Sequence, residues 1–76
     1  MKNNMHLLKR IRLKFEKTQG ELAKELGVSQ SALSQVELNN NVPSMKIFLT
    51  MVYLGYIEEK EIYDIIQELI DLKFGE

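Results

Sequence analysis

Apolar residues recur along this 76-residue chain at the three-to-four residue spacing of a helix. Leu8, Ile11 and Phe15 fall on one line and predict a first helix over about residues 4–16. No segment alternates apolar and polar residues between turn signals, as a half-buried strand would. The pattern therefore predicts an all-α fold, and the later segments bring the number of helices to five.

A second helix is predicted over about residues 19–26, with signals at both ends. Thr18 and Glu21 form a capping box, in which each side chain binds a backbone N–H group of the other residue. Gly27 stands where a residue in the left-handed conformation often ends a helix. Only Val28 and Ser29 then separate this helix from the next, so the connection must be a tight turn.

A third helix is predicted over about residues 30–38. Ser29 is a suitable N-cap, and Asn39 is expected to end the helix because asparagine tolerates the left-handed conformation. At 100° per residue, one face is apolar and consists of Ala32, Leu33 and Val36. The opposite face is polar but uncharged and consists of Gln30, Ser31, Ser34 and Gln35.

Two further helices are predicted in the remainder of the chain. Ser44 would cap a fourth helix over about residues 45–54, which Gly55 would end. The fifth, over about residues 58–72, begins with Glu58, Glu59 and Glu61, which suit the positive end of a helix dipole.

The apolar residues of the fifth helix cover about half of its circumference, more than the stripe of about 100° that packing on one core requires. Either the small domain uses the whole face for its own core, or the helix has a second partner. An exposed apolar face usually marks an interface. We therefore expect a dimer interface formed by Ile62, Ile65, Ile66, Leu69 and Ile70.

The composition is that of one small globular domain over residues 1–76, with a four-helix core over about 4–54. There is no cysteine and only one histidine, His6, so neither a disulfide nor a metal site is expected, and no cofactor is implied. No apolar run approaches the roughly 20 residues of a membrane span, and the first residues do not resemble a signal peptide. A cytoplasmic protein is expected, and an enzyme is not.

The net charge of −1 conceals a gradient along the chain. Residues 1–17 carry a net charge of +5, residues 18–56 of −1 and residues 57–76 of −5. The N-terminal segment, which includes Lys2, could therefore face a polyanion, whereas the last helix would be repelled by one.

The second and third helices, joined by a short turn that contains glycine, form a helix-turn-helix pattern. Between about Leu8 and Leu54, the chain resembles the lambda-repressor/Cro-like (XRE-type) family of helix-turn-helix DNA-binding proteins. The matching residues are Arg12, Thr18, Gln19, Leu22, Ala23, Leu26, Gly27, Val28, Ser29, Ser34, Glu37, Pro43 and Ser44.

The third helix is suited to reading bases. About nine residues span about 13 Å, enough to lie in a major groove about 12 Å wide. Glutamine can form two hydrogen bonds with adenine, and serine can pair with several bases. Gln30 and Ser31 are expected to contact bases first, followed by Gln35, whereas Ser34 could contact base or phosphate. A plain solvated helix face is the alternative.

The resemblance assigns further roles. It implies that Gln19 meets a phosphate at the start of the second helix, and that Arg12 and Glu37 form a structural salt bridge. Other phosphate contacts are expected from Lys17, Asn39, Asn40, Asn41 and Lys46. The partner would be double-stranded operator DNA, bound by a homodimer whose two recognition helices lie about 34 Å apart. The chain would then be a dimeric repressor; the alternative is an antitoxin-like interaction module whose last helix binds another protein.

Overall fold

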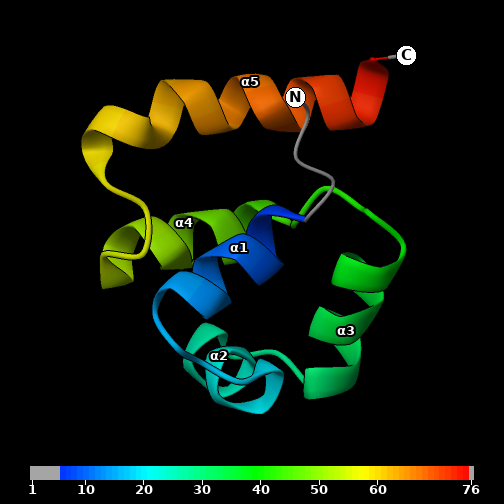
Figure 1. Cartoon of the computed structure of the whole chain (residues 1–76), viewed down its shortest axis with the longest axis vertical. Helices are drawn as coiled ribbons and strands as arrows, with labels where there is room; N and C mark the ends of the chain where they lie inside the picture. The colour runs from blue at the N-terminus through cyan, green and yellow to red at the C-terminus, as the bar shows by residue number, and fades with distance from the viewer. Residues whose placement is uncertain (1–5, 76) are drawn as a thin grey trace. The chain divides into compact units, whose positions relative to one another are not determined.

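The computed structural model describes residues 6–75, and over this range the chain is helical without a strand (Figure 1). The described residues divide into two compact units, one ending at Asn40 and the other beginning at Asn41. The first unit contains α1 (Leu7–Lys14), α2 (Gln19–Leu26) and α3 (Gln30–Leu38). The second contains α4 (Met45–Leu54), the short 3₁₀ helix η1 (Glu59–Glu61) and α5 (Ile62–Phe74). The predicted all-α class is confirmed, whereas the single domain remains a prediction.

Helix α1 is shorter than the predicted segment 4–16. It begins after His6, whose Nδ1 accepts a hydrogen bond of 3.0 Å from the Leu8 N–H group. It ends at Lys14, because Glu16 takes a left-handed conformation with φ of 57° and Lys17 N–H turns back to the Arg12 carbonyl. Residues 4 and 5 of the predicted helix, like Lys2, lie outside the described residues.

The predicted bounds of α2, α3 and α4 are confirmed, together with their caps. Thr18 Oγ1 accepts from Glu21 N–H at 3.1 Å, and Glu21 Oε1 accepts from Thr18 N–H at 2.9 Å. Gly55 ends α4 in the left-handed conformation, with φ of 89°. Asn39 ends α3 as its C-cap, as predicted, but the expected left-handed conformation is wrong: its φ is −90°, and the left-handed residue is Asn40, one position later, with φ of 57°.

The predicted fifth helix divides into two pieces. Glu58 N–H donates to Glu61 Oε1 at 2.9 Å, which closes a tight first turn as η1. The regular helix α5 starts only at Ile62 and continues to Phe74, two residues beyond the predicted end. The acidic start of the segment thus forms a cap rather than a first α-helical turn.

Each unit contains its own buried apolar residues. Those of the first unit include Leu8, Ile11, Leu22, Ala23, Leu26 and Leu33, and those of the second include Ile47, Met51, Tyr56, Ile57 and Ile65. In the first unit, two apolar positions of the predicted pattern are instead exposed, namely Phe15 and Ala32. As a result, α3 contributes a single fully buried side chain, that of Leu33, and must be held in place by other means.

Candidate nucleic-acid interface

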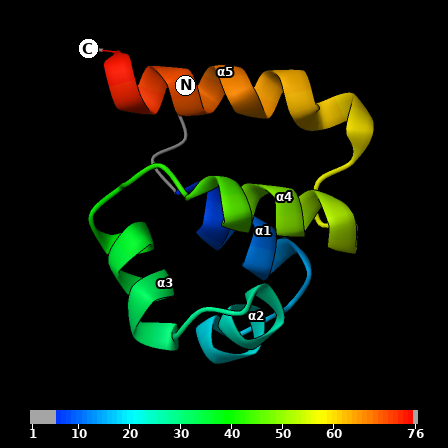
Figure 2. The same ribbon diagram turned by 180° about the vertical axis from the view of Figure 1, so that it is seen from behind.

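The turn between α2 and α3 is fixed by backbone hydrogen bonds and a cap. Gly27 is left-handed, with φ of 74°, so that Val28 N–H reaches the Ala23 carbonyl at 3.0 Å. Ser29 Oγ then accepts from Ala32 N–H at 3.0 Å and starts α3. These bonds satisfy backbone groups at the end of one helix and at the start of the next, and they set the path of the chain between the two. Both views show α2 and α3 joined by this short connection (Figures 1 and 2).

One carboxylate on α3 gathers donors from both other helices of its unit. Glu37 accepts from Arg12 Nε at 3.0 Å and Arg12 Nη2 at 3.3 Å, and also from Gln19 Nε2 at 3.0 Å. Only 6% of the Glu37 side chain and 15% of the Arg12 side chain are exposed. A two-pronged arginine–carboxylate pair has a defined geometry, so this cluster fixes α3 against α1 and the start of α2.

The first residue of α3 lies against the first turn of α2. A Cβ atom added to Gly20 would stand 3.2 Å from Gln30 Oε1 and 3.8 Å from Gln30 Cδ. The absence of a side chain at position 20 therefore leaves the space that the Gln30 carboxamide occupies. This contact joins a residue of α2 to the leading candidate for base reading.

The polar face of α3 is open to solvent. Gln30, Ser31 and Gln35 are exposed, and Ser34 is half-buried. Leu38, on the same side near the end of the helix, is 77% exposed. The only ionisable side chain of α3 is that of Glu37, which is neutralised by Arg12, so no charge on this face opposes the approach of a phosphate backbone.

Gln35 is oriented by a residue in the following turn. Its Oε1 accepts from Asn39 Nδ2 at 2.9 Å. A carbonyl oxygen has two lone pairs, so this oxygen can still accept a second hydrogen bond, and the Gln35 amide keeps both of its donor hydrogens. The pair that adenine requires, one acceptor and one donor, thus remains available on Gln35.

Besides Asn39, which donates to Gln35, two of the expected phosphate contacts are engaged with neighbouring side chains. Gln19 Nε2 donates one hydrogen to Glu37, which leaves its second hydrogen and the backbone N–H of the first helical turn for another acceptor. Lys17 Nζ lies 2.9 Å from Glu25 Oε2, so a phosphate would have to compete with that carboxylate.

The other expected phosphate contacts lie at or after the end of α3. Asn39 and Asn40 are exposed in the first unit. Asn41 and Lys46 are also exposed but belong to the second unit, Asn41 in the loop before α4 and Lys46 in the first turn of that helix. The residues of α2 and α3 that are expected to contact DNA therefore all belong to the first unit.

The charge of the first unit is compatible with a polyanion. Residues 6–40 contain six lysines and arginines against four glutamates, a net charge of +2, whereas residues 41–75 carry a net charge of −3. The gradient of the sequence is thus a difference between two structural units.

The comparison with protein families decides what this arrangement is. The model of a helix-turn-helix family, of the XRE or lambda-repressor-like type, matches residues 8–52. The chain belongs to this family. The match includes α1 from its second residue, the whole of α2 and α3, and most of α4. No curated protein and no solved structure matches the chain significantly.

Membership of the helix-turn-helix family indicates a DNA-binding regulator of transcription, a class that is not typically enzymatic. Among residues 6–75, no helix has both the length and the apolar character needed to cross a membrane. In the same range, no group of three histidine, aspartate or glutamate side chains is placed to hold a metal ion.

Sequence reasoning missed three contacts of this unit: Gln19 with Glu37, Lys17 with Glu25, and Gly20 with Gln30. Each joins positions on different elements, or in a loop and a helix, at separations that no local pattern encodes. The one available signal was the glycine at position 20. A glycine in the first turn of a helix lowers helix propensity and often marks a close approach by another group.

Proposed function

We propose that this chain is a dimeric transcriptional repressor that binds a palindromic operator, with α3 in the major groove. The observation that carries the proposal is the exposed, uncharged polar face of α3, supported from behind by the buried Glu37 cluster. A helix that reads bases must present donors and acceptors in a fixed position, and this helix has both properties. The repressor would act by occupying a site that polymerase requires.

Base contacts are assigned to Gln30, Ser31, Ser34 and Gln35. The N-terminal residues of a recognition helix contact base edges, which gives Gln30 and Ser31 the first places. Each well-formed bidentate contact discriminates against a wrong base by about 1–3 kcal/mol. Phosphate contacts are assigned to Gln19, Lys17, Asn39, Asn40, Asn41 and Lys46. Only two of these six are cations, so the affinity should fall with salt less steeply than that of a strongly basic protein.

A two-fold dimer would compensate for a modest affinity of each subunit. Two recognition helices one helical turn of DNA apart bind two half-sites, and the second contact benefits from a high effective concentration. The dimer interface is proposed on α5. Ile66 and Ile70 are exposed there, Ile62 and Leu69 are half-buried, and the burial of Ile65 places it at the edge of that surface.

Selection of bound sequences from a random pool of double-stranded DNA tests the proposal. A palindromic consensus, lost when Gln30→Ala is combined with Gln35→Ala, is the expected result. Circular dichroism and sedimentation should show the same fold and assembly for the variant, because both residues are exposed. Recovery of the same consensus by the variant would contradict the assignment of base contacts, and recovery of no consensus by the wild type would contradict operator binding.

The second candidate is an antitoxin-like protein-interaction module. The observation in its favour is the exposed apolar surface of α5, which could bind a different protein. A monomeric chain that selects no DNA sequence would favour this function over a repressor.

A further inference from the structure

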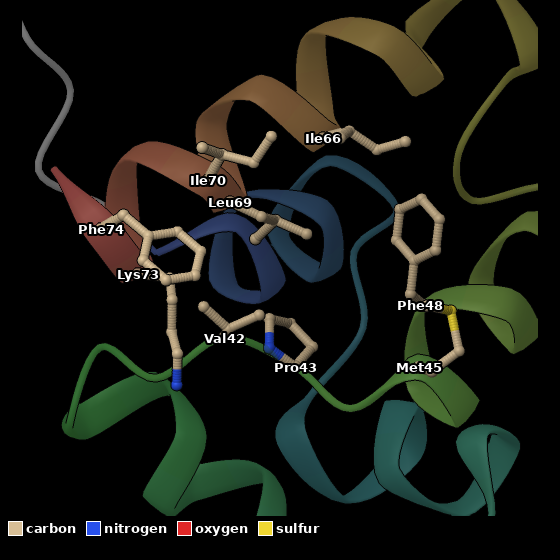
Figure 3. A pocket seen from close by; sticks show the side chains of 9 residues that line it. All are labelled: Val42, Pro43, Met45, Phe48, Ile66, Leu69, Ile70, Lys73 and Phe74. Atoms are coloured by element: carbon tan, nitrogen blue, oxygen red, sulfur yellow. The ribbon is translucent and has the colours of Figure 1, made fainter.

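A groove of about 540 Å³ lies between α4 and α5 within the second unit. Its walls are apolar, with Pro43 and Phe48 on one side and Leu69 and Ile70 on the other (Figure 3). Lys73 is the only charged residue among those that line it, and its side chain extends from α5 toward the segment that carries Val42 (Figure 3). Lys73 forms no ion pair with another residue of the described range.

The apolar half of α5 has two differently buried sides. Ile65 is 8% exposed, and Leu69 and Leu72 are half-buried. The other side is open to solvent and is defined here as the α5 seam, with exposed fractions of 71%, 39%, 43% and 77% for Tyr63, Ile66, Ile70 and Phe74. One side thus belongs to the core of the second unit, whereas the seam residues Ile66, Ile70 and Phe74 form part of the α5 wall of the open groove.

The seam has the spacing of a helix that packs along another helix. Tyr63, Ile66 and Ile70 follow one another at intervals of three and four residues, and the next two positions are Lys73 and Phe74. This alternation keeps side chains on one line facing a second helix. The seam extends for about 18 Å, since each residue of a helix adds 1.5 Å.

We propose that the seam takes α5 of a second copy of this chain in antiparallel orientation, with Ile66 of each copy opposite Ile70 of the other. The inference rests on the proposed dimer and gives it an orientation and a register. In an antiparallel two-fold pair, the residue numbers of any two facing positions add up to the same value, because a step forward along one helix is a step backward along the other. The pairing of Ile66 with Ile70 therefore places Tyr63 opposite Lys73 and Ile62 opposite Phe74.

Charge favours this orientation and this occupant. The N-terminal end of the segment, residues 58–64, contains four acidic residues against Lys60, whereas Lys73 lies near the other end. Antiparallel packing brings Lys73 of one copy to the acidic end of the other and opposite the Tyr63 ring, which attracts a cation through its face. It also opposes the two helix dipoles. Parallel packing would place the two Lys73 side chains together in the seam. The charges of the helix are thus complementary to those of a second copy that runs in the opposite direction.

Disulfide cross-linking tests the register, and the natural chain contains no cysteine to interfere. The axes of packed helices lie about 8–10 Å apart, and Cα atoms that face each other are closer together than the axes. They therefore come within the range of about 4.4–6.8 Å that a disulfide spans. A mixture of the full-length variants Ile66→Cys and Ile70→Cys should form several times more oxidised dimer than either variant alone. In this register, the same position in the two copies is offset by four residues, or about 6 Å along the helix axes. The two cysteines of a single variant are therefore farther apart than facing cysteines.

A second mixture, of Tyr63→Cys with Lys73→Cys, should behave in the same way. Asp64→Cys is the control, because Asp64 is exposed on the polar side of the same helix, away from the seam. Stronger cross-linking of each variant with itself than in the mixtures would indicate a parallel pair and overturn the proposal. Cross-linking at the level of Asp64→Cys, with a monomer in sedimentation, would also overturn it and leave the groove to a different protein. All samples are free of DNA, so this result is independent of whether the wild-type chain selects an operator.

Discussion

The exposed faces of α3 and α5 are suited to different kinds of binding partner. The face of α3 is formed by short, uncharged polar side chains such as Gln30 and Ser31, whereas that of α5 is formed by large apolar ones such as Ile70 and Phe74. Polar side chains on α3 can exchange hydrogen bonds with water for hydrogen bonds with base edges, which yields selectivity more than affinity. Removal of the α5 face from water releases free energy in proportion to its area. On the proposed function, one chain would therefore separate recognition from assembly.

The two helices are also held differently. Each has one buried side chain, Leu33 in α3 and Ile65 in α5. Helix α3 has in addition the Ser29 cap and the Glu37 cluster, which fix its start and its last turn. Helix α5 starts through a 3₁₀ turn and ends at Gly75. A helix that reads bases requires this positional precision, whereas a helix that assembles with a copy of itself can gain order from its partner.

A charge in the α5 seam should produce the largest effect. We expect Ile70→Asp to prevent dimer formation while the monomer stays folded, because Ile70 is 43% exposed. Loss of the second half-site contact should lower operator affinity by about 10²- to 10⁴-fold. Sedimentation and a DNA titration at fixed salt measure the two consequences.

The matched control is Lys60→Gln, which lowers the net charge by the same one unit at an exposed position in η1, outside the seam. It should leave both assembly and operator affinity nearly unchanged. An equal loss in the two variants would mean that the net charge of the segment formed by η1 and α5, and not the apolar seam, governs binding.

Removal of the Glu37 carboxylate should have the next largest effect and should act on the first unit. In Glu37→Ala the Arg12 guanidinium loses its partner while only 15% of its side chain is exposed, and Gln19 loses its acceptor. We expect a loss of about 2–3 kcal/mol in the free energy of unfolding, at or just below the lower end of the range for a fully buried pair, because this pair is partly buried. Urea denaturation measures this change.

The control for Glu37→Ala is Lys60→Ala, which breaks the exposed pair of Lys60 with Glu58, whose Nζ–Oε1 distance is 3.6 Å. Exposed pairs contribute little, so no measurable loss is expected there. If Glu37→Ala were as stable as Lys60→Ala, the cluster would not be what positions α3.

The sequence predicted well those features that are encoded by neighbouring residues. The bounds of α2 and α3 followed from Thr18, Gly27 and Ser29, because caps and left-handed residues act within one turn of the chain. The all-α class and the family followed from the spacing of such signals.

Predictions were less accurate where distant or unusual contacts decide. The end of α1 was misplaced because Glu16, which is not a glycine, takes the left-handed conformation. The exposure of Ala32 could not be read from its place on the helical wheel, because a wheel gives direction but not the extent of the neighbouring surface. For the site, the polar face was evident from its spacing, whereas the contacts that orient it, such as Gly20 with Gln30, depend on how the helices are packed.

The smallest expected effect comes from Gly20→Ala, which should change the stability of α2 and the placement of the α3 face in opposite directions. In Gly20→Ala, the new Cβ would lie 3.2 Å from Gln30 Oε1, so the flexible end of Gln30 must shift. Alanine is the better helix former by about 0.5–1 kcal/mol, so the variant should unfold at an equal or slightly higher urea concentration. Its preference for the consensus base that Gln30 contacts should nevertheless fall a few-fold, because a bidentate contact depends on the placement of both amide atoms.

A double-mutant cycle with Gln30→Ala makes the Gly20→Ala test specific. Once the carboxamide is absent, Gly20→Ala has nothing to displace and should change selectivity no further. An additive loss in the double variant would show that Gly20 affects DNA binding through α2 itself, for example through its first-turn N–H groups, and not through Gln30. If one added methyl group raises stability and lowers selectivity, the precise placement of the α3 face depends on the space that Gly20 leaves open on α2.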